Sequence, residues 1–416
     1  MIMWREGVVR AVGRAWTGAV EVEVELTGTP GAVAPHRAGE PGADEPGRAG
    51  EPGERAGTGR LDPGARVRAL AYPALVGAPE VGDRVSLTVA ALARGLGTGG
   101  YAMVAAIPDR LPADPPPGAG HIVKARYTPL QAMLLGVDEQ ESPWHEALRE
   151  ADDLAGLPVV VADLHSALPA VVAGVRAEAD RTGAAPPRVA YVLTDGGALP
   201  AWFSRTVATL RADGWLAGTI TVGQAFGGDL EAVTLHTGLL AAREVLDADV
   251  VVVAQGPGNL GTGTRWGFSG VACGEAVNAA AVLGGRPVAS LRVSGADPRE
   301  RHRGISHHSL TAYGRVALAA ADVVVPAFDG ASPAEVDLTD LGRQVAEEAA
   351  ALAEPHGRHR LVPVGTAGLL DALAAAPVRL STMGRSLAED PAAFLAVAAA
   401  GVHAQRLSPA GAARRR

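Results

Sequence analysis

Two hydrophobic periodicities divide the chain into a first and a second part. From residue 4 to about residue 108, apolar and polar residues alternate, as over residues 20–25 and 81–89, and glycine-rich turns separate these segments. Alternation with a period of two is typical of strands that bury one face. We therefore predict a small antiparallel β-barrel-like domain over residues 1–108.

From residue 121 onward, short continuous apolar runs alternate with amphipathic segments of helical length. Runs such as the four valines at residues 250–253 are typical of strands covered on both faces, as in a parallel sheet. The predicted strands lie at residues 157–162, 188–193, 218–222, 249–254, 287–293, 322–326 and 360–364, and the predicted helices at residues 167–180, 200–212, 229–246, 271–283, 309–320 and 338–354. Repeated βα units predict a doubly wound, mostly parallel, three-layer, Rossmann-like α/β domain over residues 121–405.

Three segments fall outside these two domains. Residues 29–64 consist mainly of Gly, Pro, Ala, Glu and Arg, and the sequence AGEPG at residues 38–42 recurs at residues 49–53. Such a segment buries too little apolar surface to offset its ordering entropy, so we predict a disordered low-complexity insertion. The proline-rich residues 109–120 predict a stiff linker, and residues 406–416 predict a flexible basic tail.

Charge, cysteine content and hydropathy narrow the classes of function. The 37 basic and 45 acidic side chains give a net charge of −8, whereas nucleic-acid binding needs a basic face, so we expect no nucleic acid partner. The single cysteine, Cys273, excludes an internal disulfide and a cysteine-clustered metal site. The longest clean apolar run, residues 392–402, is shorter than the roughly 18 residues that span a bilayer. We expect a cytoplasmic protein without a membrane partner, and the sequence is compatible with a homo-oligomer.

Polar side chains follow five successive predicted strands, at the point where each strand ends. Ligands of open α/β sheets bind beyond the carboxyl ends of the strands, so these positions are candidates for a site. Carboxylates can serve as bases or metal ligands, and imidazoles as proton carriers near neutral pH. The candidate catalytic residues are Asp163, His165, Asp195, His236 and His307, and the supporting candidates are Gln224, Asp229, Glu231, Ser306 and His308. Asp195 and Asp229 have an equal claim as helix caps or turn residues.

The segment after the run of valines is rich in glycine. Glycines let backbone N–H groups approach a ligand, threonine hydroxyls can donate, and a helix N-terminus adds a partial positive charge. These features fit phosphate or another anion, although the pattern is neither a Walker loop nor a dinucleotide fingerprint. The alternative is a loop shaped only by tight packing. The candidate anion-binding residues are Gly256, Gly258, Asn259, Gly261, Thr262, Gly263, Thr264 and Arg292.

A histidine cluster, His302, His307 and His308, lies between flanking arginines. Adjacent residues of a regular helix point in different directions, so we do not expect His307 and His308 to share one metal ion. The cluster could instead hold an anion or supply an acid or base, or it could be a loop in which Ser306 caps the next helix.

A metal site could also form from polar residues at converging strand ends. The side chains that could contribute to it are those of Asp163, His165, Asp195, Asp229 and His236. The cofactor therefore stays open, and a divalent metal ion is the less favoured expectation.

Six motifs, taken as a set, resemble a family of uncharacterised bacterial proteins, mostly from high-GC Gram-positive bacteria, known as the domain of unknown function DUF3866. They are KARYTPLQ at residues 124–131, DLHS at 163–166, TDGGALP at 194–200, GQAFGGD at 223–229, QGPGNLG at 255–261 and SHHS at 306–309. The likeness spans nearly the whole chain apart from the insertion and the tail. It implies that these loops belong together, and it brings no substrate or mechanism.

The sequence favours an enzyme that hydrolyses or transfers a group on an anionic or phosphorylated small molecule at the carboxyl edge of the sheet. Asp163 or Asp195 would act as base or metal ligand, and Arg292 would neutralise developing charge. The alternative is a non-catalytic ligand-binding or regulatory protein whose β domain docks a partner.

Overall fold

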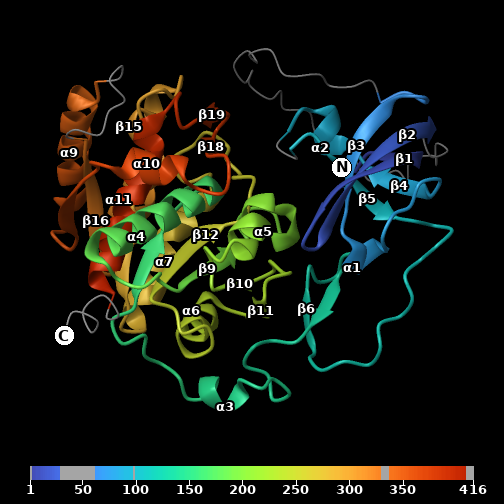
Figure 1. Cartoon of the computed structure of the whole chain (residues 1–416), viewed down its shortest axis with the longest axis horizontal. Helices are drawn as coiled ribbons and strands as arrows, with labels where there is room; N and C mark the ends of the chain where they lie inside the picture. Colours follow the sequence, from blue (N-terminus) through green and yellow to red (C-terminus); the bar gives the residue numbers. More distant parts are fainter. Residues whose placement is uncertain (1, 29–60, 97–98, 329–336, 409–416) are drawn as a thin grey trace, which may run out of the picture. The chain divides into compact units, whose positions relative to one another are not determined.

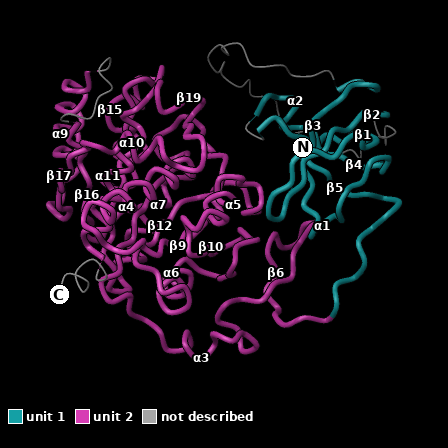
Figure 2. The backbone as a smooth tube through the Cα atoms, viewed as in Figure 1, with its two compact units in different colours: residues 1–116 teal, residues 117–416 magenta. Residues whose placement is uncertain are grey.

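The computed structural model describes residues 2–28, 61–96, 99–328 and 337–408. Its contacts divide the chain into two compact units, residues 1–116 and residues 117–416 (Figure 2). The division falls inside the segment predicted as a linker. Most of the predicted insertion, residues 29–60, and most of the predicted tail, residues 409–416, lie outside the described residues.

The first unit is a closed five-stranded barrel with the strand order β1-β2-β3-β5-β4. The strands are β1 (Trp4–Trp16), β2 (Ala19–Gly28), β3 (Arg66–Ala71), β4 (Arg84–Thr88) and β5 (Ala102–Ala106), and two short helices, α1 (Pro73–Val76) and α2 (Ala90–Ala93), lie between them. All pairs are antiparallel except β3–β5, which is parallel, so the predicted antiparallel barrel is confirmed with one parallel pair.

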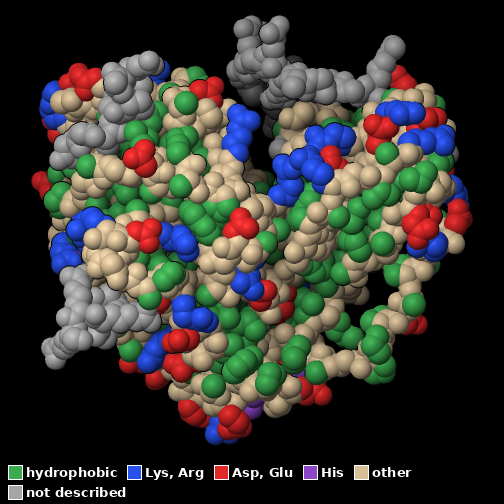
Figure 3. All heavy atoms as spheres, viewed as in Figure 1, with side chains coloured by type: hydrophobic (Ala, Val, Ile, Leu, Met, Phe, Trp, Pro, Cys, Tyr) green, Lys and Arg blue, Asp and Glu red, His purple; other side chains and the backbone are tan. Residues whose placement is uncertain are grey.

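The alternation in β2 produces the two faces of this barrel. Val22 and Val24 are buried, whereas Glu21 and Glu23 face outward and pair with arginines of β3. Acidic and basic side chains are accordingly interspersed on the visible surface of the barrel (Figure 3).

The second unit contains an eight-stranded parallel sheet with the order β11-β10-β9-β12-β8-β13-β16-β17. The strands are β8 (Pro158–Val161), β9 (Val189–Thr194), β10 (Gly218–Thr221), β11 (Leu230–Glu231), β12 (Val250–Gln255), β13 (Arg286–Ser290), β16 (Asp322–Ala327) and β17 (Arg360–Gly365). Every strand predicted for this unit is present. The additional edge strand β11 lies where a helix was predicted, because its two residues pair with β10 and helix α6 begins only at Leu235.

Helices cover the sheet in two groups (Figure 1). The first group contains α4 (Leu168–Thr182), α10 (Leu369–Ala374) and α11 (Pro391–Leu407), which pack on one another. In the second group α6 (Leu235–Glu244) packs on α7 (Ala272–Val282). Both α7 and α9 (Thr339–Ala353) pack on a π-helical turn at Ala312–Val316. Right-handed crossovers that step in opposite directions along a parallel sheet place their helices on opposite faces. The chain is therefore a doubly wound, three-layer α/β protein in this unit.

The remaining elements of the second unit are short. They are the strands β6 (Ile122–Lys124), β7 (Ala132–Leu134), β14 (Val293–Ser294), β15 (Gly304–Ile305), β18 (Ser381–Thr382) and β19 (Arg385–Ser386), and the helices α3 (His145–Leu148), α5 (Arg205–Ala212) and α8 (His307–Thr311). The helix predicted over residues 309–320 is thus shorter and begins earlier, because Ser306 caps it and the chain leaves the π-helical turn at Ala317.

β8 is the first strand of the sheet along the chain, and it lies between β12 and β13. The connection from β8 to β9 and the connection from β12 to β13 run in opposite directions along the sheet. The chain leaves β8 through α4 to reach β9, and it leaves β12 through α7 to reach β13 on the far side of β8. Loops on either side of β8 therefore diverge toward opposite faces, which is where open α/β sheets form ligand sites.

Glycine brings the backbones of α4 and α11 into contact. A Cβ on Gly174 would lie 2.0 Å from the carbonyl oxygen of Ala398, and a Cβ on Gly401 would lie 2.0 Å from that of Val171. Helix α11 is buried along most of its length, although no helix among the described segments is long and apolar enough to cross a membrane.

We predict that Gly401→Ala destabilises the second unit by about 1–3 kcal/mol, because the added methyl group forces α11 away from α4. The matched control is Gly342→Ala in α9, where the added carbon would lie 3.5 Å from the ring of Phe328, an ordinary contact distance. That control should be neutral or stabilising by about 0.5–1 kcal/mol. Chemical denaturation measures both, and equal stability of the two variants would contradict the close helix crossing.

Candidate functional site

The carboxylate of Asp163 is buried immediately after β8, between a guanidinium and an imidazole. Nη1 of Arg292 donates to Oδ2 at 3.3 Å, and Nδ1 of His308 lies 3.2 Å from the same oxygen. The exposed fractions are 7% for the Asp163 side chain and 10% for each of the other two. Burial by itself raises the pKa of the Asp163 carboxyl, but Arg292 and His308 outweigh burial and hold this pKa below its usual value. The site therefore contains a buried negative charge.

Local hydrogen bonds bring Arg292 and His308 together. The backbone N–H of Arg292 donates to Oγ of Ser309 at 2.9 Å, and its carbonyl accepts from the N–H of Ser306 at 2.8 Å. Ser306 also caps α8, because its Oγ accepts from the N–H of His308. The motif at residues 306–309 thus holds the start of α8, by hydrogen bonds, against the segment that follows β13.

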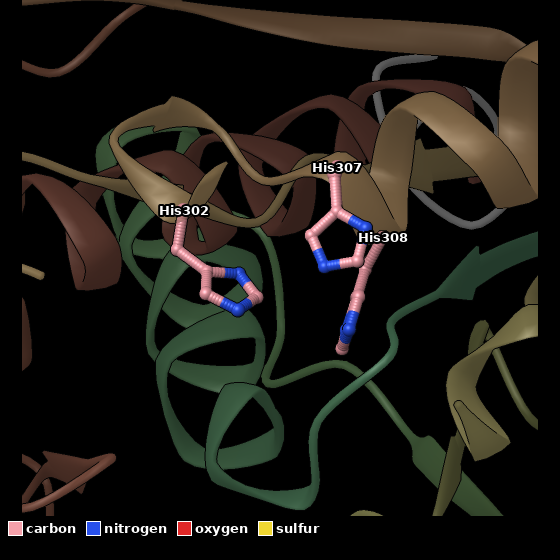
Figure 4. A group of neighbouring side chains, drawn as sticks. All are labelled: His302, His307 and His308. Carbon is pink, nitrogen blue, oxygen red and sulfur yellow. The ribbon is translucent and has the colours of Figure 1, made fainter. Parts of the chain in front are cut away.

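The three rings of the histidine cluster face one another (Figure 4). The ring centroids of His307 and His308 are 4.5 Å apart, and that of His302 lies 4.9 Å from His307 and 5.1 Å from His308. The expectation that His307 and His308 point apart is therefore wrong. Both stand in the first turn of α8, where no preceding turn restricts the side chains.

Phe268 fixes the orientation of this cluster. Its ring stacks on His308 with centroids 3.8 Å apart and an interplanar angle of 7°, and it meets His307 edge-on at 5.9 Å. Burial, together with the positive charge of Arg292, lowers the pKa of His302 to about 3. Burial and the neighbouring His308 lower the pKa of His307 to about 4. His302 and His307 are consequently neutral at pH 7.

His165 occupies a different environment. Its Nδ1 lies 3.1 Å from the hydroxyl of Tyr191 and its Nε2 lies 2.7 Å from Oγ of Ser204. The Tyr191 hydroxyl donates to the carbonyls of Ala254 and Gln255, so it accepts from Nδ1–H, and Ser204 donates to Nε2. Burial lowers the pKa of His165 to about 4. Both nitrogens of this neutral imidazole thus have protein partners that tie together the ends of β8, β9 and β12.

Two of the other candidates lie at the ends of β9 and β10. Asp195 is exposed, and its Oδ2 accepts from the backbone N–H of Gln224 at 2.9 Å. The backbone carbonyl groups of this loop are close to Lys124, whose buried Nζ donates to Thr221, Ala225 and the carboxylate of Glu231 at 2.8–2.9 Å.

Lys124 is a buried site residue to which we assigned no role from the sequence. Burial lowers its pKa, and the Glu231 carboxylate opposes that effect. One signal was visible in the sequence, because Lys124 is the single lysine in a chain whose other basic side chains are arginines. Its three acceptors make it a structural cation that holds β6 against β10 and β11.

Asp229 and His236 lie apart from Asp163. Asp229 accepts from the N–H and hydroxyl of Thr219 and pairs with Arg211 at 2.9 Å, whereas His236 is exposed in the first turn of α6. Among the described residues, the only group of three potential metal ligands with atoms within 4.8 Å of one another is the histidine cluster. The structure therefore does not assemble the metal set that would have included Asp229 and His236.

The glycine-rich loop after β12 closes on itself. The hydroxyl of Thr262 donates to the carbonyl of Gly267, and that of Thr264 accepts from the N–H of Gly267 at 3.1 Å. The carbonyl Oδ1 of Asn259 accepts from Ser269 at 2.7 Å. The other predicted members of the loop are Gly256, which is buried, Gly258 and Gly263, which have positive φ, and Gly261.

Packing explains the glycine at one end of this loop, because a Cβ on Gly256 would lie 2.4 Å from the carbonyl oxygen of Ala198. A Cβ on Gly197, in the loop after β9, would lie 2.1 Å from the carbonyl oxygen of Gly256, so the two loops run in backbone contact. Residues 261–266 are exposed beyond that contact.

Two small hollows flank Asp163, one on each side of β8. The first, of about 30 Å³, is lined by Ser290, Arg292 and Arg385, and the second, of about 20 Å³, by Gln255 and Cys273. In the described part of the chain, Oγ of Ser290 and Oε1 of Gln255 are buried and have no hydrogen-bond partner. Buried polar atoms are nearly always paired, so both hollows have the lining of sites for a water molecule or a small polar group. Asp195, Asn259 and His307 line neither hollow.

The fold and this site define an α/β protein in which buried charged and imidazole groups gather at the carboxyl edge of a parallel sheet. Residues 68–401 match the family described as protein of unknown function (DUF3866), and the chain belongs to this family. No curated protein and no solved structure matches the chain significantly. The matched segment begins in β3 and ends in α11, so it includes parts of both units.

We predict that Asp163→Ala costs the second unit about 3–5 kcal/mol, because it leaves the buried guanidinium of Arg292 without its partner. The control is Asp340→Ala, which removes an ion pair with Arg343. The side chain of Asp340 is 91% exposed, so this variant should change stability by less than about 1 kcal/mol. Chemical denaturation compares the two, and similar losses would contradict a buried charge network at β8.

We predict that the second unit loses stability as the pH falls from about 6.5 toward 4. The pKa values of His165 and His307 are both lowered from 6.5 to about 4, so between these values the unfolded chain binds protons that the folded chain does not. The loss should reach about 1.4 kcal/mol per pH unit for the more deeply buried imidazole of His165 and should be smaller for His307, which is partly exposed. His165→Gln should therefore reduce it. Melting temperatures recorded as a function of pH provide the measurement, and a flat profile across this range would contradict it.

Proposed function

We propose that this protein is an enzyme that hydrolyses or transfers a group on an anionic small molecule, such as a phosphorylated metabolite or nucleotide, bound beside Asp163 at the carboxyl edge of the sheet. The observation that carries the proposal is the buried cluster of Asp163, Arg292 and His308 at the end of β8. At this strand the connections from β8 to β9 and from β12 to β13 run in opposite directions along the sheet. Positions of this kind hold the ligands of open α/β sheets.

The guanidinium of Arg292 is suited to an anion. Among the contacts of the described residues, its Nη1 alone meets Asp163 and His308, at 3.3 and 3.1 Å, which leaves Nη2 and Nε to bind a ligand. A guanidinium presents such donors in a rigid fork that matches two oxygens of a phosphate or carboxylate. The unpartnered hydroxyl of Ser290 lines the same hollow and can donate to a third oxygen.

The size of the hollow limits how a substrate can enter. About 30 Å³ accommodates one water molecule or a few substrate oxygens, so the anionic group would enter while the rest of the molecule stays outside. A buried anion-binding fork of this kind stabilises charge that develops in a transition state, because water cannot screen it.

The carboxylate of Asp163 would keep His308 in one tautomer. If Nδ1–H donates to Asp163, Nε2 is unprotonated and can accept a proton from an attacking water or hydroxyl group. His165 and Lys124 would act in this proposal as structural groups, because protein partners already occupy their polar atoms.

The test is a thermal-shift screen of phosphorylated metabolites and dicarboxylates on the full-length protein. At least one anion should raise the melting temperature in proportion to its concentration, and Arg292→Lys should weaken its binding by about tenfold or more, because lysine keeps the charge and loses the fork. Arg343→Lys, at an exposed ion pair on α9, is the control.

Equal affinities of Arg292→Lys and the unaltered protein would contradict the site. Turnover of each anion that binds is assayed by product release. If an anion binds through Arg292 but is never converted, the protein is a non-catalytic ligand-binding protein and the proposal of an enzyme is wrong.

A further inference from the structure

We propose that His302, His307 and His308 bind a divalent transition-metal ion of the Zn²⁺ class, and that Asp163 and Ser306 orient two of the three imidazoles. The metal-binding claim stands by itself. The role that follows from it, activation of a water molecule for attack on the bound anion, rests on the function proposed above.

The geometry of the histidine cluster is the first support. One ring nitrogen of each histidine lies within 4.8 Å of a ring nitrogen of each of the other two. His302 comes from a 3-10 turn at Glu300–His302, and the other two come from the first turn of α8, so two separate segments turn their rings toward a common space (Figure 4). A tetrahedral Zn²⁺ with Zn–N bonds of about 2.0–2.1 Å would draw these nitrogens to about 3.3 Å from one another, a closure of up to about 1.5 Å.

The hydrogen bonds at the outer side of the rings are the second support. Nδ1 of His302 is 2.7 Å from Oγ of Ser306, and Nδ1 of His308 is 3.2 Å from Oδ2 of Asp163. Metal-bound histidines generally donate their second ring N–H to a carboxylate or another oxygen, which fixes the tautomer and the ring orientation. Nε2 is then the nitrogen that His302 presents to an ion. His308 also presents Nε2 if its Nδ1–H donates to Asp163, although Nη1 of Arg292, which can only donate, lies 3.1 Å from the same Nδ1.

The third support is an unsatisfied atom. Nε2 of His307 is buried and has no hydrogen-bond partner among the described residues. A buried nitrogen without a partner is costly unless something outside the described chain completes it. An ion shared with the other two Nε2 atoms would do so, and the stack of Phe268 on His308 holds that ring ready.

The charges around the cluster are compatible with a cation. The guanidinium of Arg292 is paired with Asp163, and Arg299 and Arg385 are both paired with Asp297, at 2.9 and 3.0 Å. Three imidazoles suit Zn²⁺ and its neighbours in the first transition series, and three protein ligands leave a fourth position open for water. Zn²⁺ lowers the pKa of such a water to about 7, so hydroxide would be available for attack on an anion held by Arg292. With the metal bound, Nε2 of His308 would be a ligand, and the metal-bound water would take the place of proton transfer to that nitrogen.

The experiment titrates the chelator-treated, full-length protein with Co²⁺ and, separately, with Zn²⁺. We expect a saturable visible absorption typical of tetrahedral Co²⁺, displaced by Zn²⁺, and a rise in melting temperature with Zn²⁺. His307→Gln, which preserves side-chain volume, and His302→Ala should each weaken binding at least about 100-fold. Asp163→Asn should weaken it about 10–100-fold, as loss of an orienting carboxylate does.

His356→Ala is the matched control, because His356 is an exposed histidine outside the cluster, and it should bind the metal as the unaltered protein does. Melting curves recorded with chelator present show which variants are folded, and only folded variants enter the comparison. If His302→Ala fails to fold, His307→Gln and Asp163→Asn decide the question.

Absence of a saturable Co²⁺ spectrum, or equal affinities of His307→Gln and His356→Ala, overturns the metal site. If metal binding fails while an anion still stabilises the protein through Arg292, the metal site alone is wrong. If the metal binds and no anion does, the proposed function is wrong and the metal site stands.

Discussion

The buried carboxylate of Asp163 is the constraint on which the rest of the site depends. A charge with 7% of its side chain exposed is stable only with a partner of opposite charge and with hydrogen bonds. Arg292 supplies the opposite charge, and Arg292 and His308 both lie within hydrogen-bond distance of the carboxylate. Arg292 follows β13 and His308 opens α8, so one carboxylate joins the first strand of the sheet to segments more than a hundred residues later. Together with the hydrogen bonds of Ser306 and Ser309 to the backbone of Arg292, that pairing holds the start of α8 beside β8.

Tight backbone packing makes the surroundings of this charge rigid. Gly174 and Gly401 bring the backbones of α4 and α11 into contact. Gly197 and Gly256 bring the loop after β9 against the loop after β12. Interiors packed in this way leave few voids, and the two small hollows beside Asp163 each contain a buried polar atom without a partner in the described chain, Ser290 or Gln255. The polar lining of these hollows, and not their volume, distinguishes them from ordinary packing gaps.

One geometry relates the two proposals. The face of Asp163 that accepts from Arg292 adjoins the hollow proposed for the anion, and the same carboxylate oxygen orients His308 toward the histidine cluster. Asp163 would therefore act on both functions through its partners, by orienting Arg292 toward the anion and His308 toward the metal. His165, by contrast, occurs in the same motif two residues later and faces Tyr191 and Ser204 in the protein interior.

Local pattern by itself determined the barrel, the parallel sheet and the fact that polar residues stand at the strand ends, because periods of two and continuous valine runs depend only on neighbouring residues. The tertiary structure decided which of those ends meet. The strand order places β12 and β13 on the two sides of β8, so Asp163 meets Arg292, whereas Asp195 and Asp229 belong to strands farther along the sheet. Strand order and the rotamers at the start of α8 arise from contacts between distant segments, and for this reason the convergence of the three histidines was not visible in the sequence.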